Sequence, residues 1–275
     1  MINIVNISRL FYFVNMNFLR IIFLWLFFSF SVNAAKPVEV NLAAGAGLKD
    51  CLNAQIILYK KIAPDVKIVP NYEASGKLQE QIVNGAPVDV FISANQEKMD
   101  IIEKRNLVVK GTRINLVQNK IVLIVPASRK SDIHCFACLG TDKLRDKGFA
   151  IGDPKVVPAG KYAVEVLETL KISGKVLPKA VLAQNVRVVL TYVARGEVDA
   201  GVVYYTDALI MPDKVKVIAE APEGSYTPAI FPAAIIKTGN NQEAGKNFLN
   251  FLATPEAKKI FQKYGYQNIN SELKK

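Results

Sequence analysis

The chain has 275 residues, of which 51% are apolar and 21% are charged, and its formal net charge is +11 at pH 7. This composition supports one large domain or two smaller domains, and it excludes a disordered, collagen-like or coiled-coil protein. The lysine and arginine residues are scattered along the sequence, so we expect no nucleic-acid partner. The positive charge implies only that anions are not repelled.

Residues 1–34 are typical of a secretory signal peptide. Arg9 and Arg20 precede the apolar run 21–32, and the small residue Ala34 follows it. The run is shorter than the roughly 20 residues that a membrane-spanning helix needs. We therefore predict that residues 1–34 are a cleaved signal peptide and that the protein is exported.

The rest of the chain alternates between strand and helix patterns. This alternation predicts an α/β fold in which each lobe is a mostly parallel sheet flanked by helices. We predict strands at 38–43, 66–69, 88–93, 120–125, 149–152, 200–204 and 233–236. The segment 135–147 has no clear period and indicates that the chain has crossed into a second lobe. The predicted domains are lobe 1, at 35–118 plus 232–275, and lobe 2, at 119–231.

Local signals predict where several helices begin and end. Asn185 is a suitable N-cap for a helix that Gly196 ends, and Thr254 with Pro255 predicts the start of the last helix. Gly85 is expected to end a helix that follows the turn at 73–76.

The three cysteines are Cys51, Cys135 and Cys138. Because exported proteins meet an oxidising compartment, a local disulfide between Cys135 and Cys138 is the favoured interpretation. A redox motif and a metal site that includes His134 remain open alternatives. Cys51 is predicted to be a buried apolar residue.

Four junctions between strands and helices are candidates for an anion site. In open α/β sheets, ligands bind beyond the carboxyl ends of strands, where helix N-termini offer unpaired N–H groups. The junctions are at 45–47, 74–76, 158–160 and 185–186. The Gly45–Gly47 turn does not continue as a dinucleotide fingerprint, because Asp50 stands where the third glycine belongs. His134 is the only histidine and no nucleophile elbow is present, so we expect no enzyme of the serine-histidine type.

With these motifs in view, the chain resembles the periplasmic molybdate-binding proteins of ABC importers (ModA-like, type II periplasmic binding proteins). The resemblance covers residues 38 to about 267. It rests on the segments 43–50, 74–78, 85–96, 152–163, 185–187 and 201–208. It implies two lobes joined by a hinge of two crossing segments, which close on a tetrahedral oxyanion.

The resemblance also implies which residues bind the ligand. They contribute hydroxyl groups or backbone amides and are Gly47, Ser75, Ala159, Val186 and Tyr204. The family usually has serine where this chain has Gly47, so one hydroxyl donor is lost here. Glu73, an acid beside Ser75, must point away from the anion or be paired.

The function implied is that of a non-enzymatic periplasmic protein that captures molybdate or tungstate and delivers it to an ABC transporter membrane permease. No cofactor and no bare metal ion are implied, and we expect a monomer. Molybdate, tungstate and sulfate are dianions that only accept hydrogen bonds, whereas phosphate usually keeps a proton that a cage of donors cannot satisfy. The alternatives are a binding protein for another oxyanion such as sulfate, and an exported redox protein that uses Cys135 and Cys138.

Overall fold

The computed structural model describes residues 36–128, 130–144 and 148–269. The predicted signal peptide, residues 1–34, lies outside these described residues. Among the helices described, none is both long and apolar enough to cross a membrane.

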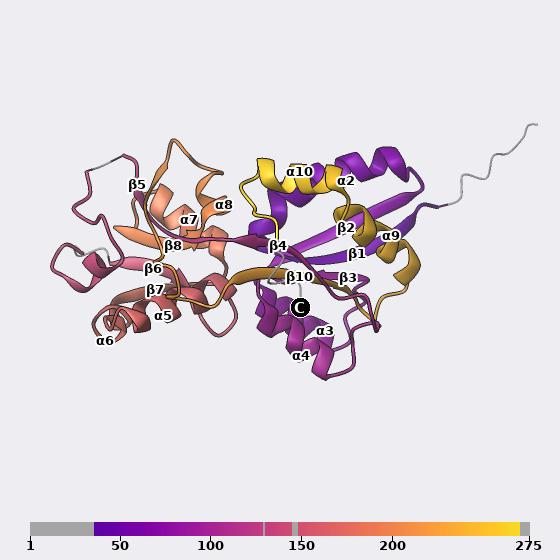
Figure 1. Cartoon of the computed structure of the whole chain (residues 1–275), viewed down its shortest axis with the longest axis horizontal. Coiled ribbons are helices and arrows are strands. Elements are labelled where there is room, and N and C mark those ends of the chain that lie inside the picture. The colour runs from indigo at the N-terminus through magenta and orange to yellow at the C-terminus, as the bar shows by residue number, and fades with distance from the viewer. Residues whose placement is uncertain (1–35, 129, 145–147, 270–275) are drawn as a thin grey trace, which may run out of the picture. The chain divides into compact units, whose positions relative to one another are not determined.

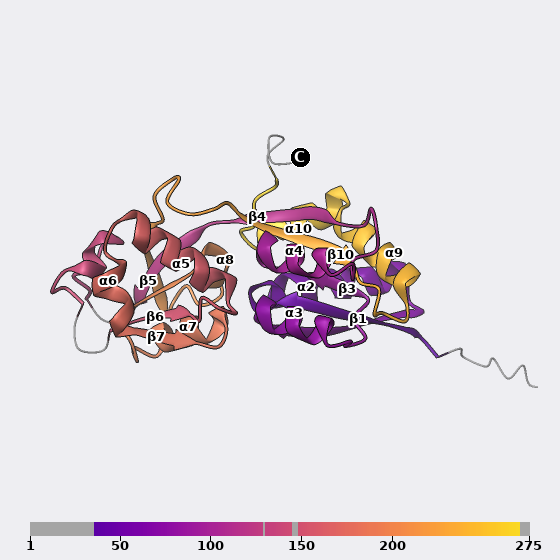
Figure 2. The same cartoon turned by 90° about the horizontal axis from the view of Figure 1, so that it is seen from below.

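Two five-stranded sheets organise the chain (Figures 1 and 2). Sheet 1 has the strand order β2-β1-β3-β10-β4, and sheet 2 has the order β7-β6-β8-β5-β9. Below, half 1 means sheet 1 with the helices that pack on it, and half 2 means sheet 2 with its own helices.

The elements of half 1 come from both ends of the described chain. They are β1 (Val38–Gly45), η1 (Ala46–Leu48), α2 (Lys49–Ile62), β2 (Val66–Glu73), α3 (Ser75–Val83), β3 (Val90–Ile92), α4 (Gln96–Lys104), β4 (Ile114–Asn119), β10 (Ala229–Ile235), α9 (Gln242–Leu252) and α10 (Pro255–Lys263).

The elements of half 2 follow one another without interruption. They are β5 (Ile121–Pro126), η2 (Ala137–Gly140), β6 (Phe149–Gly152), α5 (Pro158–Thr169), α6 (Ser173–Val176), η3 (Leu177–Lys179), β7 (Ala180–Ala183), α7 (Val186–Ala194), β8 (Ala200–Tyr204), α8 (Tyr205–Ala208) and β9 (Val215–Glu220).

The two-sheet α/β fold agrees with the prediction, but each sheet is mixed. In sheet 1, β1 pairs parallel with β2 and β3, whereas β10 pairs antiparallel with β3 and β4. Sheet 2 is mixed in the same way, because β6 pairs parallel with β7 and β8 whereas β5 pairs antiparallel with β8 and β9. The strands next to the two crossovers, β4–β5 and β9–β10, make the antiparallel pairs. The second crossover ends where β10 begins at Ala229, three residues before the predicted lobe boundary.

The core of half 1 lies on both faces of sheet 1. Successive strand residues point to opposite faces, so Leu42 and Ala43 enter different apolar clusters, as do Ile92 and Phe91. Figure 1 shows α3 and α4 on one side of the sheet and α2, α9 and α10 on the other. Because both faces are covered, strands such as β3 are apolar throughout.

Local signals predicted several helix ends correctly. Asn185 caps α7, Thr254 caps α10 with Pro255 in its first turn, and Gly85 and Gly196 take left-handed φ values of 87° and 66° just after α3 and α7. The strands β4, β7 and β9 were not predicted. β7 and β9 lie at an edge of sheet 2, where half-exposed residues such as Leu182 weaken the apolar pattern.

Candidate functional site

The five predicted binding residues all lie where a strand meets a helix. This placement follows from the fold, because each βα unit ends a strand and begins a helix at the same edge of its sheet. Gly47 is in η1, Ser75 begins α3, Ala159 is the second residue of α5, Val186 begins α7, and Tyr204 ends β8.

The starts of α5 and α7 offer backbone N–H groups. Asn185 Oδ1 accepts the N–H groups of Arg187 and Val188, at 3.0 and 3.1 Å, and leaves that of Val186 outside the cap. In α5 the first residue is Pro158, which has no N–H, so Ala159 supplies the first donor of the helix. Both N–H groups lie at the positive end of a helix dipole, where an anion is stabilised.

Ser75 and Tyr204 meet at one residue, Ala94, although they come from different halves. Ser75 Oγ accepts the Ala94 N–H at 2.9 Å, and the Tyr204 hydroxyl donates to the Ala94 carbonyl oxygen at 2.9 Å. Ser75 is fully buried and Tyr204 is 1% exposed. A serine hydroxyl that accepts one hydrogen bond keeps its own proton, so Ser75 can still donate to an anion.

Tyr204 is held among other aromatic side chains. Its ring packs edge-on against Phe231 at 5.0 Å and Tyr162 at 6.4 Å. Burial in this group raises the pKa of Tyr204 well above its usual value of 10. The hydroxyl is therefore neutral at physiological pH and can act as a hydrogen-bond donor.

Gly47 faces half 2 across η1. A Cβ atom at this position would lie 3.4 Å from Asp207 Oδ1 and 3.7 Å from Val186 Cγ1, which are ordinary contacts. Its carbonyl oxygen accepts hydrogen bonds from Arg187 Nη2 at 2.9 Å and from the Tyr266 hydroxyl at 3.1 Å. The φ of Gly47 is not in the left-handed region, so its backbone conformation does not require glycine.

An ion-pair cluster that was not predicted lies beside Gly47. Arg187 Nε lies 2.9 Å from Asp207 Oδ1, and Arg187 Nη2 lies 2.7 Å from Asp50 Oδ2. The Asp207 side chain is fully buried, and burial raises its pKa to about 6 although the Arg187 charge acts to lower it. The available sequence signal was an arginine directly after Val186, within the segment 185–187 that carries the resemblance.

Comparison with known proteins assigns a family to this chain. Residues 40–267 match the model of the bacterial extracellular solute-binding proteins. The chain belongs to this family. The molybdate-binding protein ModA of Haemophilus influenzae is 35% identical over 240 residues, which is 87% of this chain and 92% of that protein. ModA of Escherichia coli is also 35% identical, over 83% of this chain and 88% of its own length.

A solved structure supports the fold independently. The periplasmic molybdate-binding protein of Azotobacter vinelandii superposes with a TM-score of 0.74, at 22% identity, over 84% of this chain and all of that chain. This confirms the predicted fold of a two-lobed periplasmic binding protein. The solute-binding family is a family of binding proteins, and its members act outside the cytoplasm.

Ala159 belongs to a segment that makes a contact between the halves in this solute-binding protein. The Gly76 N–H donates to the carbonyl oxygen of Val156, three residues before Ala159, at 2.9 Å. A Cβ on Gly76 would lie 2.7 Å from Val156 Cα, so this approach requires glycine. Within the described residues, no hydrogen bond joins Ala159 to the other four predicted binding residues.

Glu73, the acid beside Ser75, is fully partnered. Its Oε1 accepts the Ala74 N–H at 2.8 Å and the Asn185 Nδ2 group at 3.3 Å, and its Oε2 lies 3.6 Å from Lys77 Nζ. These partners compensate the carboxylate charge. Glu73 is therefore paired, which is one of the two arrangements that we expected for an acid beside Ser75. Lys77 lies on a partly exposed helix face, with 37% of its side chain accessible.

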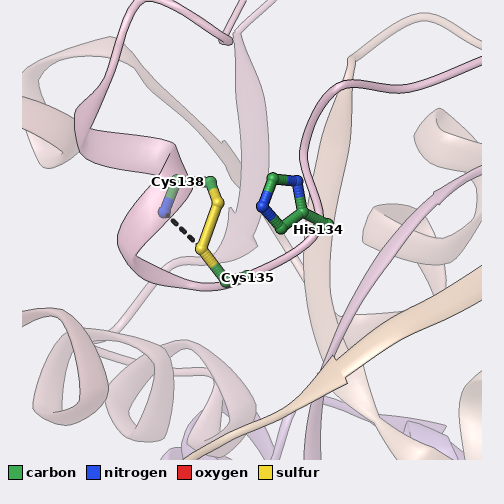
Figure 3. A group of neighbouring side chains, drawn as sticks. All are labelled: His134, Cys135 and Cys138. Atoms are coloured by element: carbon green, nitrogen blue, oxygen red, sulfur yellow. Dashed lines mark hydrogen bonds between the residues drawn. A yellow bond between two sulfur atoms is a disulfide. The ribbon is translucent and has the colours of Figure 1, made fainter.

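The three cysteines take two different states. Cys135 and Cys138 form a disulfide, and His134 lies beside them (Figure 3). The ligand atoms of these three residues lie within 4.8 Å of one another, but disulfide sulfur atoms are not thiolate ligands for a metal. Cys51 is a free thiol that is 1% exposed, and burial raises its pKa to about 12. Cys51 is thus an inert core residue.

One cavity lies away from the five predicted residues, at the crossovers between the sheets. Its volume is about 420 Å³, and residues lining it include Asn119, Lys120, Glu220 and Tyr226. Lys120 Nζ lies 2.8 Å from Glu220 Oε2, and Glu223 adds a second carboxylate to the lining, so the cavity has no excess of positive charge. The cavity offers no excess of donors for an anion, and we prefer the junction residues as the site.

Proposed function

We propose that this protein captures molybdate or tungstate between its two halves and delivers the anion to the membrane permease of an ABC importer. The ModA relatives, which are named for molybdate binding, support this ligand class. The proposed ligands of the anion are Ser75 and Tyr204 through their hydroxyl groups and Gly47, Ala159 and Val186 through their backbone amides.

Neutral hydrogen-bond donors lie at one edge of each sheet, and this observation is the main support for the proposal. Ser75 keeps its hydroxyl proton while it accepts from Ala94, and the first N–H groups of α5 and α7 lie outside their helices' own hydrogen bonds. Molybdate and tungstate are dianions that only accept hydrogen bonds. A site made of donors therefore fits them, while a protonated phosphate would leave a donor facing a donor, at a cost of about 1–3 kcal/mol.

The proposal also covers the lobe boundaries, the hinge and the state in which the protein acts. We place lobe 1 at residues 35–118 plus 232–275 and lobe 2 at 119–231, with the crossovers β4–β5 and β9–β10 as the hinge. The protein acts as a periplasmic monomer after cleavage of residues 1–34. It needs no cofactor and catalyses no reaction.

A panel of anions tests the ligand class. A ligand that binds only the folded protein raises its stability, and at 100 times Kd the gain is about 2.7 kcal/mol, or roughly 5–10 °C in Tm for a chain of this size. We expect molybdate and tungstate to raise the Tm by this amount, sulfate to raise it far less, and phosphate to leave it unchanged.

The panel also separates the alternative oxyanion. An equal shift with sulfate and molybdate would contradict the molybdate assignment and leave a general binding protein for tetrahedral dianions. Isothermal titration calorimetry with the two anions then gives the ratio of their Kd values directly.

A further inference from the structure

Arg187 reaches three acceptors with one guanidinium group, and two of them lie in the other half of the molecule. In its own half, Nε pairs with Asp207 Oδ1 at 2.9 Å. In half 1, Nη2 lies 2.7 Å from Asp50 Oδ2 and 2.9 Å from the Gly47 carbonyl oxygen. The side chain of Arg187 is 20% exposed and that of Asp50 is 40% exposed, so the ion pair between the halves is partly shielded from water.

The partner in half 2 holds Arg187 in place independently of half 1. Asp207 is completely buried, and Arg187 is the cation paired with it, so a movement between the halves would leave this pair intact. The ion pair keeps the guanidinium beside Asp207, and the N–H groups of a guanidinium form a planar, rigid fork. The Nη2 group of Arg187 can therefore bind the Asp50 carboxylate and the Gly47 carbonyl oxygen when half 1 approaches half 2.

We propose that Arg187 is a clasp that helps to hold the two halves closed, through Asp50 and the Gly47 carbonyl oxygen, and thereby lengthens the time for which the anion stays bound. The inference rests on the proposed function. Arg187 follows Val186, and Gly47 lies three residues before Asp50, so the clasp and the proposed anion ligands share the same two backbone segments. Arg187 is a positioning residue, since it acts through these segments.

The chemistry of the clasp accounts for the choice of arginine. A lysine ammonium also has three donors, but all three are on one nitrogen, whereas the acceptors here contact two nitrogens of the guanidinium, Asp207 at Nε and Asp50 with the Gly47 carbonyl oxygen at Nη2. Several other contacts between the halves are single hydrogen bonds, such as Gly76 N–H to Val156 at 2.9 Å and Lys98 Nζ to the Lys155 carbonyl at 3.1 Å. A second ion pair between the halves joins Glu97 of α4 to Lys161 of α5. Arg187 combines an ion pair and a charged hydrogen bond at one point.

The clasp affects affinity through the closed population. When only the closed form binds tightly, the measured Kd equals the intrinsic Kd divided by the fraction that is closed. Loss of a contact present only in the closed form therefore weakens binding and speeds dissociation, even though no ligand atom loses a partner.

The test uses Asp50→Asn, which removes the ion pair between the halves and leaves the Arg187–Asp207 pair untouched. We expect the Kd for molybdate to rise about threefold to tenfold, with a matching increase in the dissociation rate, because partly exposed ion pairs are modest in strength. Arg187→Lys, which keeps a positive charge beside Asp207, should raise the Kd at least as much.

The control is Asp100→Asn, which breaks an ion pair of the same kind inside half 1. Arg113 Nη2 lies 2.6 Å from Asp100 Oδ1, and the side-chain exposures of 23% and 44% match the 20% and 40% of Arg187 and Asp50. This variant should bind molybdate with unchanged Kd. An equal loss of affinity in Asp50→Asn and Asp100→Asn would overturn the proposal, as would an unchanged Kd in Asp50→Asn.

A second readout does not depend on the ligand. Spin labels at Ile57→Cys and Leu182→Cys, which replace side chains that are 66% and 55% exposed in half 1 and half 2, report the distance between the halves. Asp50→Asn should shift this distance distribution toward longer values with and without molybdate. If wild-type protein bound no molybdate, the proposed function would fail, and the distance measurement alone would decide the clasp: identical distributions in wild type and Asp50→Asn would refute it.

Discussion

The hydroxyl group of Tyr204 donates its proton to the carbonyl oxygen of Ala94, 2.9 Å away, in the other half of the molecule. This proton must turn from Ala94 to an anion when the site is filled, whereas Ser75 can donate without giving up its bond with the Ala94 N–H. The two hydroxyl groups therefore make different contributions to the site, and each can be removed separately.

Tyr204→Phe should weaken molybdate binding and lower the stability of the free protein. The change removes one donor and leaves the buried Ala94 carbonyl oxygen without this partner, which costs about 1–3 kcal/mol. Calorimetry and thermal unfolding check the two effects. Tyr226→Phe serves as the control, because its hydroxyl accepts the Ile121 N–H at 3.2 Å, beside the crossover cavity; it should leave the Kd unchanged.

Ser75→Ala should raise the Kd for molybdate by a factor of roughly 10 to 100, because hydrogen bonds to charged groups contribute about 1.5–3 kcal/mol. Lys77→Ala is the matched control two residues along the same helix, where the side chain is partly exposed and lies near Glu73. A comparable loss of affinity in Lys77→Ala would show that a cation holds the anion, contrary to a site of neutral donors.

Gly47→Ser tests the position where the chain departs from the family pattern. The φ of Gly47 suits any residue, and a Cβ would have ordinary contacts with Asp207 and Val186, so we expect the Tm of the free protein to change little. The added hydroxyl should leave the Kd for molybdate unchanged or lower it. A large rise in Kd with an unchanged Tm would mean that the ligand packs against the bare glycine and that the site is built for a bulkier anion.

Asp207 makes stability depend on pH. Burial raises its pKa from 3.8 to about 6, so the folded protein binds more protons than the unfolded chain between these values. Its contribution to stability is therefore fully present below about pH 4 and is lost as pH rises through about 6, a change of about 3 kcal/mol. The free energy of unfolding of wild type minus that of Asp207→Asn, measured by denaturant titration from pH 4 to 7.5, should fall accordingly. A difference that is constant with pH would contradict the raised pKa.

The disulfide distinguishes a binding protein from a redox protein. The double variant Cys135→Ser, Cys138→Ser should bind molybdate with the wild-type Kd, because these residues lie outside the proposed site. Its stability should fall by about 2 kcal/mol, the entropy expected for closing so short a loop. Loss of all measurable activity together with retained folding would instead support the exported redox protein.

The sequence alone determined the local architecture of the site. Asn185 as N-cap, the junction at 158–160 and the glycines after α3 and α7 are signals that act within a few residues of chain, so each could be recognised without the rest of the protein. The alternation of strands and helices placed these signals at the edges where α/β sheets bind ligands.

The tertiary structure alone decided which distant residues meet. Ser75 and Tyr204 both bond to Ala94, and Arg187 joins Asp50 to Asp207, because the two sheets bring these segments together. Sequence patterns of period 2 or 3.6 describe which face a side chain takes on its own element. They carry no information on which other element packs against that face, so the contacts between the halves and the buried state of Asp207 required the folded molecule.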